Sequence, residues 1–460
     1  GPGATTANYA VDTASPAAFQ STTVASTGGT VVSTYYNSTN TAVSVTTPIA
    51  SNDATLIGGT LQIQAKVAAN GTYAPIGNAA AITDSGTQTV SLSASDVEAL
   101  SNFGNTVSLY FRAVITDSAG NATTGTASAT TLTVDQAPPT VSTFSMDDTS
   151  LITGDTATVT LTFSEAVTGF NSDDDITEQS GTLGTMTSNN NIAWTGTFTP
   201  SANTSDSTNT LSLAITYTDV AGNPGPTATT ANYVVDTTAN TVDTFTMSDT
   251  ALKAGETSTV TIIFSEAVTG FAKTDITAPN GTLGDLQSQD NITFTSVFTP
   301  TADTTDSENV LTLSGNYTDT LGNAGPTGAT TANYAVDTDL PAMTTVTIAS
   351  SNNTATLAST GQTVTLDIDA DEAIAQPTVV FTSGGQAAGS VTYSDKGDGD
   401  ASTWTAAYTV AGSHTDGTVA FTLDFADLAG NSGTQVTAVT NNSSVTVDQT
   451  AIDEGLRAYM

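Results

Sequence analysis

The residues of this chain that could do chemistry are its carboxylates. Aspartate and glutamate number 44 against six lysine and arginine residues, which gives a formal net charge of -38 over 460 residues. Cysteine is absent and His414 is the single histidine, which excludes thiolate chemistry and repeated histidine sites. What remains is oxygen chemistry. Carboxylates held close together repel one another unless a hard cation such as calcium lies between them.

The carboxylates recur at fixed places in an internal repeat. The segment Phe163–Phe170 returns unchanged as Phe264–Phe271, about one hundred residues later. The other shared segments are Gly-Thr-Leu-Gly (181–184 and 281–284), Phe-Thr-Pro (198–200 and 298–300) and Tyr-Thr-Asp followed by Gly-Asn (217–223 and 317–323).

The flanking regions keep only the outline of this repeat. The turn Asp-x-x-Gly-Asn also occurs at 117–121 and 427–431, each time ahead of a strand that ends in Val-Asp. Prolines near these Val-Asp pairs suit linkers, since proline cannot extend a central strand. The sequence therefore predicts six segments: 1–13, the last strand of a preceding repeat; 14–137, 138–238, 239–338 and 339–450, four domains; and 451–460, a tail outside the repeat.

Within a repeat, apolar residues alternate with threonine and serine at the period of a strand. The segments 156–163, 259–264 and 211–217 each show this pattern. About seven strands per hundred residues, separated by Asn, Gly, Asp and Ser turns, are typical of an immunoglobulin-like sandwich. We expect an all-β chain of four tandem immunoglobulin-like β-sandwich domains in an elongated array, with one short helix opened by Ser95-Asp96-Val97-Glu98.

Sandwich topology brings certain carboxylates together. The loops after the second and sixth strands lie at the end where the preceding linker arrives. Glu165 follows a second strand, Asp219 follows a sixth strand, and Asp135 lies in the linker. Calcium takes six to eight oxygen ligands, so these sets predict calcium sites at the domain junctions. The sets are Asp135, Glu165 and Asp219; Asp236, Glu266 and Asp319; and Asp337, Asp339, Glu372 and Asp427.

The same aspartates have a second interpretation. Aspartate before Gly-Asn often forms a turn by binding its own backbone, and aspartate in a linker is often simply solvated. The acidic runs 173–175 and 395–400 lack the spacing of an EF-hand, so we expect solvated loops there. Both interpretations of the junction aspartates stay open at this point.

The repeated motifs together resemble the bacterial immunoglobulin-like repeats of giant surface adhesins, which include proteins secreted by type I systems and biofilm-associated proteins. The resemblance is strongest over 138–338. It implies an extracellular stalk at the bacterial cell surface that holds a distal adhesive domain away from the cell, with neighbouring repeats as partners and calcium at the junctions. The first domain departs from the pattern, because it has Gln62–Val67, including Lys66, where the others have a glutamate after the second strand.

Other function classes find little support. Six scattered cations cannot form a face for nucleic acid, and no apolar run is long enough for direct membrane insertion. No nucleophile elbow is present and aromatic residues are scarce, so we expect no enzyme. The alternative is an adhesive or self-assembling module that binds a glycan or protein through loops of the first or fourth domain. The strand 1–13 would either fray or pair with another chain.

Overall fold

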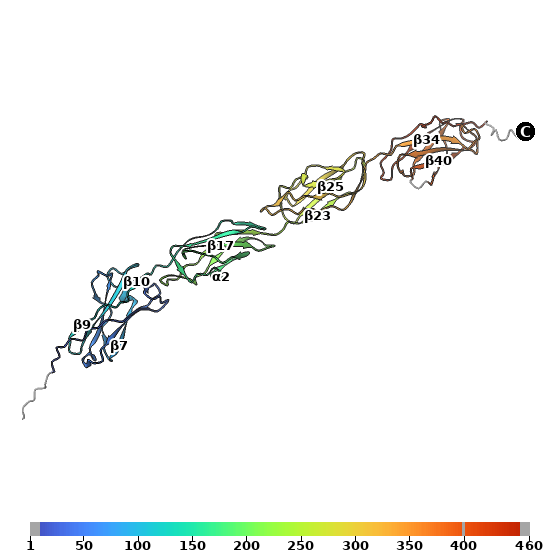
Figure 1. Cartoon of the computed structure of the whole chain (residues 1–460). Coiled ribbons are helices and arrows are strands. Elements are labelled where there is room, and N and C mark those ends of the chain that lie inside the picture. Colours follow the sequence, from blue (N-terminus) through green and yellow to red (C-terminus); the bar gives the residue numbers. More distant parts are fainter. Residues whose placement is uncertain (1–9, 398–400, 451–460) are drawn as a thin grey trace, which may run out of the picture. The chain divides into compact units, whose positions relative to one another are not determined.

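The computed structural model describes residues 10–397 and 401–450. Contacts divide the chain into two compact units, one ending at Thr238 and one beginning at Ala239. Both units are built almost entirely of strands, as the arrows in Figure 1 show, which confirms the all-β prediction. Among the described residues, buried apolar side chains form four separate clusters, and we call the strands around them sandwiches 1 to 4. The domain boundaries remain predictions.

The first unit contains sandwiches 1 and 2. Sandwich 1 consists of β1 (Thr23–Thr27), β2 (Tyr35–Tyr36), β3 (Ala42–Ile49), η1 (Ala54–Leu56), β4 (Thr60–Val67), β5 (Ala74–Pro75), β6 (Ala80–Ala81), β7 (Gly86–Ser93), α1 (Ala94–Glu98), β8 (Ser108–Thr116), β9 (Ala122–Thr124) and β10 (Leu132–Val134). Sandwich 2 consists of β11 (Val141–Met146), β12 (Ser150–Ile152), β13 (Ala157–Phe163), β14 (Val167–Thr168), α2 (Ser172–Asp175), β15 (Ile176–Thr177), β16 (Gly181–Leu183), β17 (Ala193–Pro200), β18 (Ser205–Asn209), β19 (Ser212–Leu213), β20 (Thr218–Asp219), β21 (Ala228–Thr229) and β22 (Tyr233–Asp236).

The second unit contains sandwiches 3 and 4. Sandwich 3 consists of β23 (Val242–Met247), β24 (Ala251–Lys253), β25 (Ser258–Phe264), β26 (Val268–Thr269), η2 (Lys273–Asp275), β27 (Ile276–Thr277), β28 (Gly281–Leu283), β29 (Thr293–Pro300), β30 (Thr305–Asn309), β31 (Thr312–Leu313), β32 (Thr318–Asp319) and β33 (Tyr334–Asp337). Sandwich 4 consists of β34 (Met343–Ser350), β35 (Leu357–Ala358), β36 (Thr363–Ala370), β37 (Thr378–Ser383), β38 (Gln386–Ala387), β39 (Thr392–Asp395), β40 (Thr403–Thr409), β41 (Gly417–Asp424) and β42 (Thr446–Val447).

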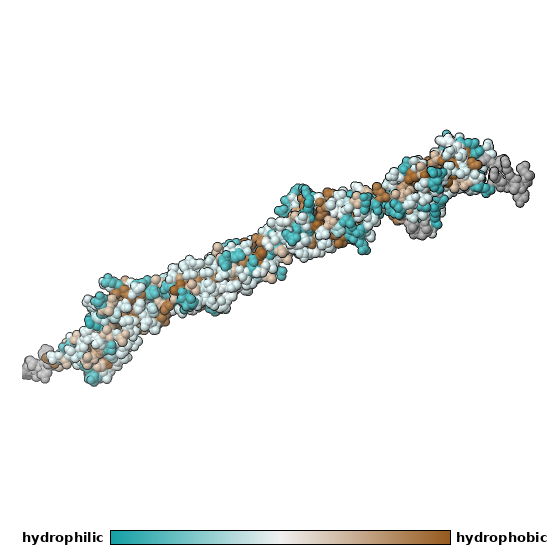
Figure 2. Space-filling view, turned by 45° about the horizontal axis from the view of Figure 1, so that its top comes forward, coloured by the Kyte–Doolittle hydropathy of each residue, from teal (hydrophilic) through white to brown (hydrophobic). Residues whose placement is uncertain are grey.

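Alternation of side chains explains why these segments are strands. In β13 the residues at every second position are buried, among them Val159, Leu161 and Phe163, while the threonines between them face outward. Polar and weakly hydrophilic residues consequently cover most of the face seen in Figure 2, and hydrophobic residues appear there only in small groups. No helix in the described part of the chain is both long and apolar enough to span a membrane.

Each sandwich includes one short strand that runs parallel to the last strand of the sandwich. The parallel pairs are β2 with β10, β12 with β22, β24 with β33, and β35 with β42. All other named strand pairs are antiparallel, and sandwiches 2 and 3 repeat each other's main sheet as β11-β13-β17-β16 and β23-β25-β29-β28. The parallel strand ends where the chain leaves the sandwich, so the residues after it lie beside the outgoing linker.

Several predicted elements differ in detail. The predicted strand 211–217 is broken after β19, because Ala214 N–H donates to the backbone oxygen of Asp175 instead of to a strand. The acidic run 173–175 is the short helix α2 and not a solvated loop, and Asp175 is buried with its carboxylate accepting from Asn171 N–H at 2.7 Å. The predicted helix is α1, but its cap is Ser93, paired with Asp96 in a capping box.

Some predictions concern residues that the structure describes only in part. Residues 10–13 lie in no strand, whereas residues 1–9, residues 398–400 of the acidic run at 395–400, and the tail 451–460 lie outside the described residues. Pairing of the stretch 1–13 with another chain therefore stays a prediction.

Candidate metal centres

In the first unit, three predicted carboxylates meet at the end of sandwich 2 that sandwich 1 precedes. Asp135 directly follows β10, Glu165 comes two residues after β13, and Asp219 ends β20. Each offers one carboxylate oxygen, and these three oxygens lie within 4.8 Å of one another. Asp219 is fully buried, and the other two are partly buried. The three side chains thus lie together, as the sandwich topology predicts.

The second unit has a matching group where β33 of sandwich 3 leads into sandwich 4. Asp337 ends β33, Glu372 comes two residues after β36, and Asp427 follows β41 and bridges to Ile374. Oxygens of Asp337, Glu372 and Asp427 lie within 4.8 Å of one another. Asp339, predicted for the same set, is not part of this group.

The glutamate of each group has a raised pKa. Burial raises the pKa of Glu165, and the charges of Asp219 and Asp135 raise it further. Burial likewise raises the pKa of Glu372, followed by the charges of Asp427, Asp337, Asp371 and Asp339. Both glutamates are therefore harder to ionise than a free glutamate, and a cation among the carboxylates would relieve that cost.

The buried aspartate of each group also forms its own turn. In Asp219, one carboxylate oxygen accepts from Asn223 N–H at 2.8 Å and the other from Asn223 Nδ2 at 2.8 Å. In Asp427, one oxygen accepts from Asn431 N–H at 2.8 Å and the other from Asn431 Nδ2 at 2.7 Å. The turn-forming interpretation is thus correct for these residues. It does not compete with a metal, because in both aspartates the oxygen that accepts from the asparagine Nδ2 keeps a second lone pair.

The set Asp236, Glu266 and Asp319 draws on both units. Asp236 is buried at the end of β22 in the first unit, and the other two residues belong to sandwich 3. Oxygens of Glu266 and Asp319 lie within 4.8 Å of each other. Beside them, Asn240 donates through Nδ2 to the backbone oxygen of Glu266 at 3.4 Å, and its Oδ1 is buried with no hydrogen-bond partner among the described residues. A metal ion shared by all three carboxylates stays a prediction.

Sandwich 1 differs from the others for a reason other than the one predicted. Its strand equivalent to β13 is β3, which ends at Ile49 and is followed by Ala50, Ser51 and Asn52, so no glutamate stands there. The segment Gln62–Val67 lies in β4 instead, and the Lys66 ammonium stacks over Tyr73 at 4.9 Å from the ring centroid. Among the described residues, no group of three carboxylates forms around the turn aspartate Asp117.

Hydrogen bonds alone satisfy that turn aspartate. Burial would raise the pKa of Asp117, but hydrogen bonds from the side chain and backbone of Asn121, together with Ala119 and Gly120, outweigh it and lower the pKa. Asp117 therefore needs no cation to remain ionised.

The geometry of the two complete groups fits calcium. Two oxygens bound to one calcium ion at its usual distances of 2.3–2.6 Å lie at most about 5 Å apart. The oxygens of each triad satisfy that limit. The unpartnered Asn240 Oδ1 beside Glu266 is a further oxygen of the kind that calcium accepts.

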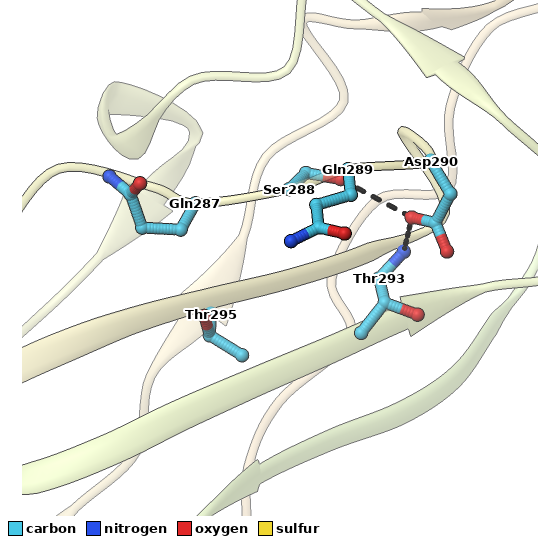
Figure 3. Close-up of a pocket in the computed structure, with 6 residues that line it drawn as sticks. All are labelled: Gln287, Ser288, Gln289, Asp290, Thr293 and Thr295. Atoms are coloured by element: carbon cyan, nitrogen blue, oxygen red, sulfur yellow. Dashed lines mark hydrogen bonds between the residues drawn. The ribbon is translucent and has the colours of Figure 1, made fainter.

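One surface hollow of sandwich 3 shows no comparable chemistry. It has a volume of about 450 Å³ and is lined by Gln287, Ser288, Gln289, Asp290, Thr293 and Thr295 (Figure 3). Its one carboxylate, Asp290, accepts from Thr293 N–H at 2.8 Å and from Ile292 N–H at 2.9 Å, and these bonds lower its pKa. The carboxylate is thus occupied in closing its own turn.

Two comparisons bear on identity. Residues 135–235 and 236–336 each match the family model of a bacterial Ig-like domain, which supports a bacterial immunoglobulin-like repeat region over these residues. No curated protein matches the chain significantly.

Two solved structures show low similarity to the chain. A stretch of titin is 10% identical, with 66% of this chain and 99% of that chain covered and a TM-score of 0.25. The insect immune protein hemolin is 11% identical, with 92% and 99% covered and a TM-score of 0.22.

Proposed function

We propose that the chain is an extender segment of a bacterial cell-surface adhesin, in which calcium stiffens the junctions between successive sandwiches and a distal domain does the binding. The observation that carries this proposal is the recurrence of one carboxylate triad, two aspartates and a glutamate, at the same position in both units. A site that mattered only to one domain would have no reason to recur at the entry to the next.

The electrostatics support a junction that needs a cation. Each of the two triads draws one aspartate from the end of the preceding sandwich or the linker directly after it, and two carboxylates from the following sandwich. Without a cation these groups repel one another, and a net charge of -38 adds a repulsion that salt screens only beyond about 8 Å. A calcium ion would tie the linker to the following sandwich.

The near-identity of sandwiches 2 and 3 supports a spacer over a recognition module. They share motifs and the strand order and register of the main sheet. Even the register shift in the first strand pair recurs, after Val141 pairs with Phe163 and after Val242 pairs with Phe264. Two nearly identical domains in succession add length to the chain, whereas recognition of a ligand seldom needs the same binding surface twice. We propose no enzymatic role.

Small-angle scattering and thermal melting of the whole chain test this function. In millimolar calcium we expect a larger radius of gyration and a higher Tm than in chelator. For a site with a Kd of about 10 μM, about 1 mM calcium should raise the free energy of unfolding of the domain that holds the site by about 2.7 kcal/mol. Scattering and melting that are the same in calcium and in chelator would overturn the proposal and favour the alternative, a module that binds a glycan or protein through loops of sandwich 1 or 4.

A further inference from the structure

The asparagine of the turn Asp-x-x-Gly-Asn reaches out of its own sandwich. In the first unit, Asn223 Oδ1 accepts from the backbone N–H of Ser38 in sandwich 1 at 2.8 Å. Its Nδ2 donates to the backbone oxygen of Asp135 in the linker at 3.0 Å. Asn223 is fully buried, so both bonds form away from water.

The second unit repeats both bonds with different residues. Asn431 Oδ1 accepts from the backbone N–H of Ala254 in sandwich 3 at 2.8 Å. Its Nδ2 donates to the backbone oxygen of Asp337 at 2.9 Å, and the residue is 3% exposed. The two donors, Ser38 and Ala254, share no side-chain chemistry.

The two donors share a position in the fold. Tyr36 pairs with Val134 in the parallel pair β2–β10, and Ser38 lies two residues further on. Leu252 pairs with Val336 in β24–β33, and Ala254 also lies two residues further on. The donated N–H is therefore the one that points out of the sandwich just after the short parallel strand. The bond does not depend on the side chain of the donor residue.

The first turn of the chain shows the same asparagine with only half of these bonds. Asn121 Nδ2 donates to the backbone oxygen of Asp12 at 3.2 Å, as the other two asparagines do to their linkers. Its Oδ1 has no hydrogen-bond partner in the part of the chain that the structure describes. A Cβ on Gly120 would meet nothing within 4 Å, whereas a Cβ on Gly222 would lie 2.7 Å from Asn37 Nδ2 of sandwich 1.

We propose that Asn223 and Asn431 are positioning residues that couple consecutive sandwiches without a metal ion. Each asparagine holds three elements at once: its own turn aspartate, the incoming linker, and the exit of the preceding sandwich. Each asparagine therefore orders the junction before a cation arrives. It holds in place the two aspartates of the triad, one at the linker and one in the turn. Since the coupling uses neutral amide groups, it persists in chelator, and its test does not depend on calcium binding.

Amide hydrogen exchange of the whole chain in chelator tests the coupling. In Asn223→Ala, the amide of Ser38 should exchange at least about fivefold faster, and the amide of Ala254 should not change. In Asn431→Ala the effects should be reversed. Asn121→Ala is the matched control, because it loses the same turn bonds without a partner at Oδ1, and it should change neither amide.

A distance measurement addresses the junction directly. Because the chain has no cysteine, spin labels can be attached at Ser91→Cys in sandwich 1 and Thr199→Cys in sandwich 2, both exposed. Asn223→Ala should broaden the distance distribution. Ser38→Pro, which removes the donor from the other side, should broaden it equally, and the double variant should be no broader than either single variant.

Two outcomes would overturn the proposal. One is unchanged exchange at Ser38 in Asn223→Ala, and the other is an equal increase in Asn121→Ala. Should Asn223→Ala open the core of sandwich 2, seen as fast exchange in β13, Ser38→Pro decides alone: an unbroadened distribution would then refute the coupling. Loss of the calcium response with intact coupling would refute only the proposed function.

Discussion

Glu165 and Asp219 hold two carboxylate oxygens within 4.8 Å of each other, one partly buried and one fully buried. Burial of Glu165, and then the charges of Asp219 and Asp135, raise its pKa above the ordinary value of 4.5. Between the unfolded and folded pKa values, the folded chain binds more protons than the unfolded chain. The stability of the metal-free chain should therefore fall as pH rises through this range.

Glu165→Gln tests this dependence on pH. In chelator at about pH 7 the variant should melt above the wild-type chain, because the repelling charge is gone. Near about pH 5 the difference should shrink, since the wild-type glutamate becomes partly protonated. A difference in Tm that does not depend on pH would show that the carboxylates do not interact.

Glu372→Gln and Asp339→Asn form a matched pair for the calcium response of the second unit. Glu372 belongs to the triad and Asp339, although close enough to affect its pKa, does not. Calorimetric titration of the whole chain should lose one calcium site in Glu372→Gln and none in Asp339→Asn. Exposed Asp174, substituted by asparagine, should also leave the titration unchanged. Equal losses in the two variants would place the ion outside the triad.

Gly222→Ala and Gly120→Ala separate backbone strain from junction packing. The two glycines have φ values of +96° and +98°, so alanine should cost about 1–2 kcal/mol of strain at either place. Only at Gly222 would the new Cβ also press on sandwich 1, at 3.0 Å from Thr30 Cγ2. Exchange of the amides in 30–39 should therefore rise in Gly222→Ala alone, and equal exchange in both variants would contradict the packing at this junction.

Tyr217→Phe should destabilise sandwich 2 by about 0.5–1.5 kcal/mol, because Tyr217 OH donates to the backbone oxygen of Pro226 at 2.8 Å from a buried position. Chemical denaturation measures this change. The loss of stability should be the same in calcium and in chelator, because the tyrosine is not a ligand. Tyr317→Phe should destabilise sandwich 3 in the same way, because Tyr317 OH donates to the backbone oxygen of Pro326. A loss that appears only in calcium would contradict this assignment.

The sequence predicted the fold class and the triads because both depend on regular spacing. Alternating apolar residues indicate strands, and the loops after the second and sixth strands meet wherever a sandwich forms. For that reason Glu165 and Glu372 could be placed without coordinates. In sandwich 1 the second strand was predicted wrongly as the segment that forms β4. Buried and exposed residues alternate as clearly in β4 as in β3, and nothing local tells which strand comes second.

The bonds of Asn223 and Asn431 could not be predicted in the same way. Their partners are backbone N–H groups of Ser38 and Ala254, and a backbone donor leaves no trace in the side chains around it. The recurrence of asparagine at the end of all four turns was the available signal, and turn formation alone accounted for it. Likewise, the break after β19 depends on a backbone bond to Asp175 that no spacing reveals.

Because the outgoing N–H belongs to the backbone, this bond does not depend on the side chain of its donor, although in the first unit Asn37 Nδ2 adds a side-chain bond to the backbone oxygen of Ala221 at 2.7 Å. In the two described junctions the following sandwich brings the acceptor, in the asparagine, and the preceding sandwich brings the donor, after the short parallel strand. A repeat copied whole would carry both the turn asparagine and the short parallel strand that these junctions use, since every sandwich has both. An array of such repeats can be lengthened or shortened by whole units without any compensating change at the new boundary.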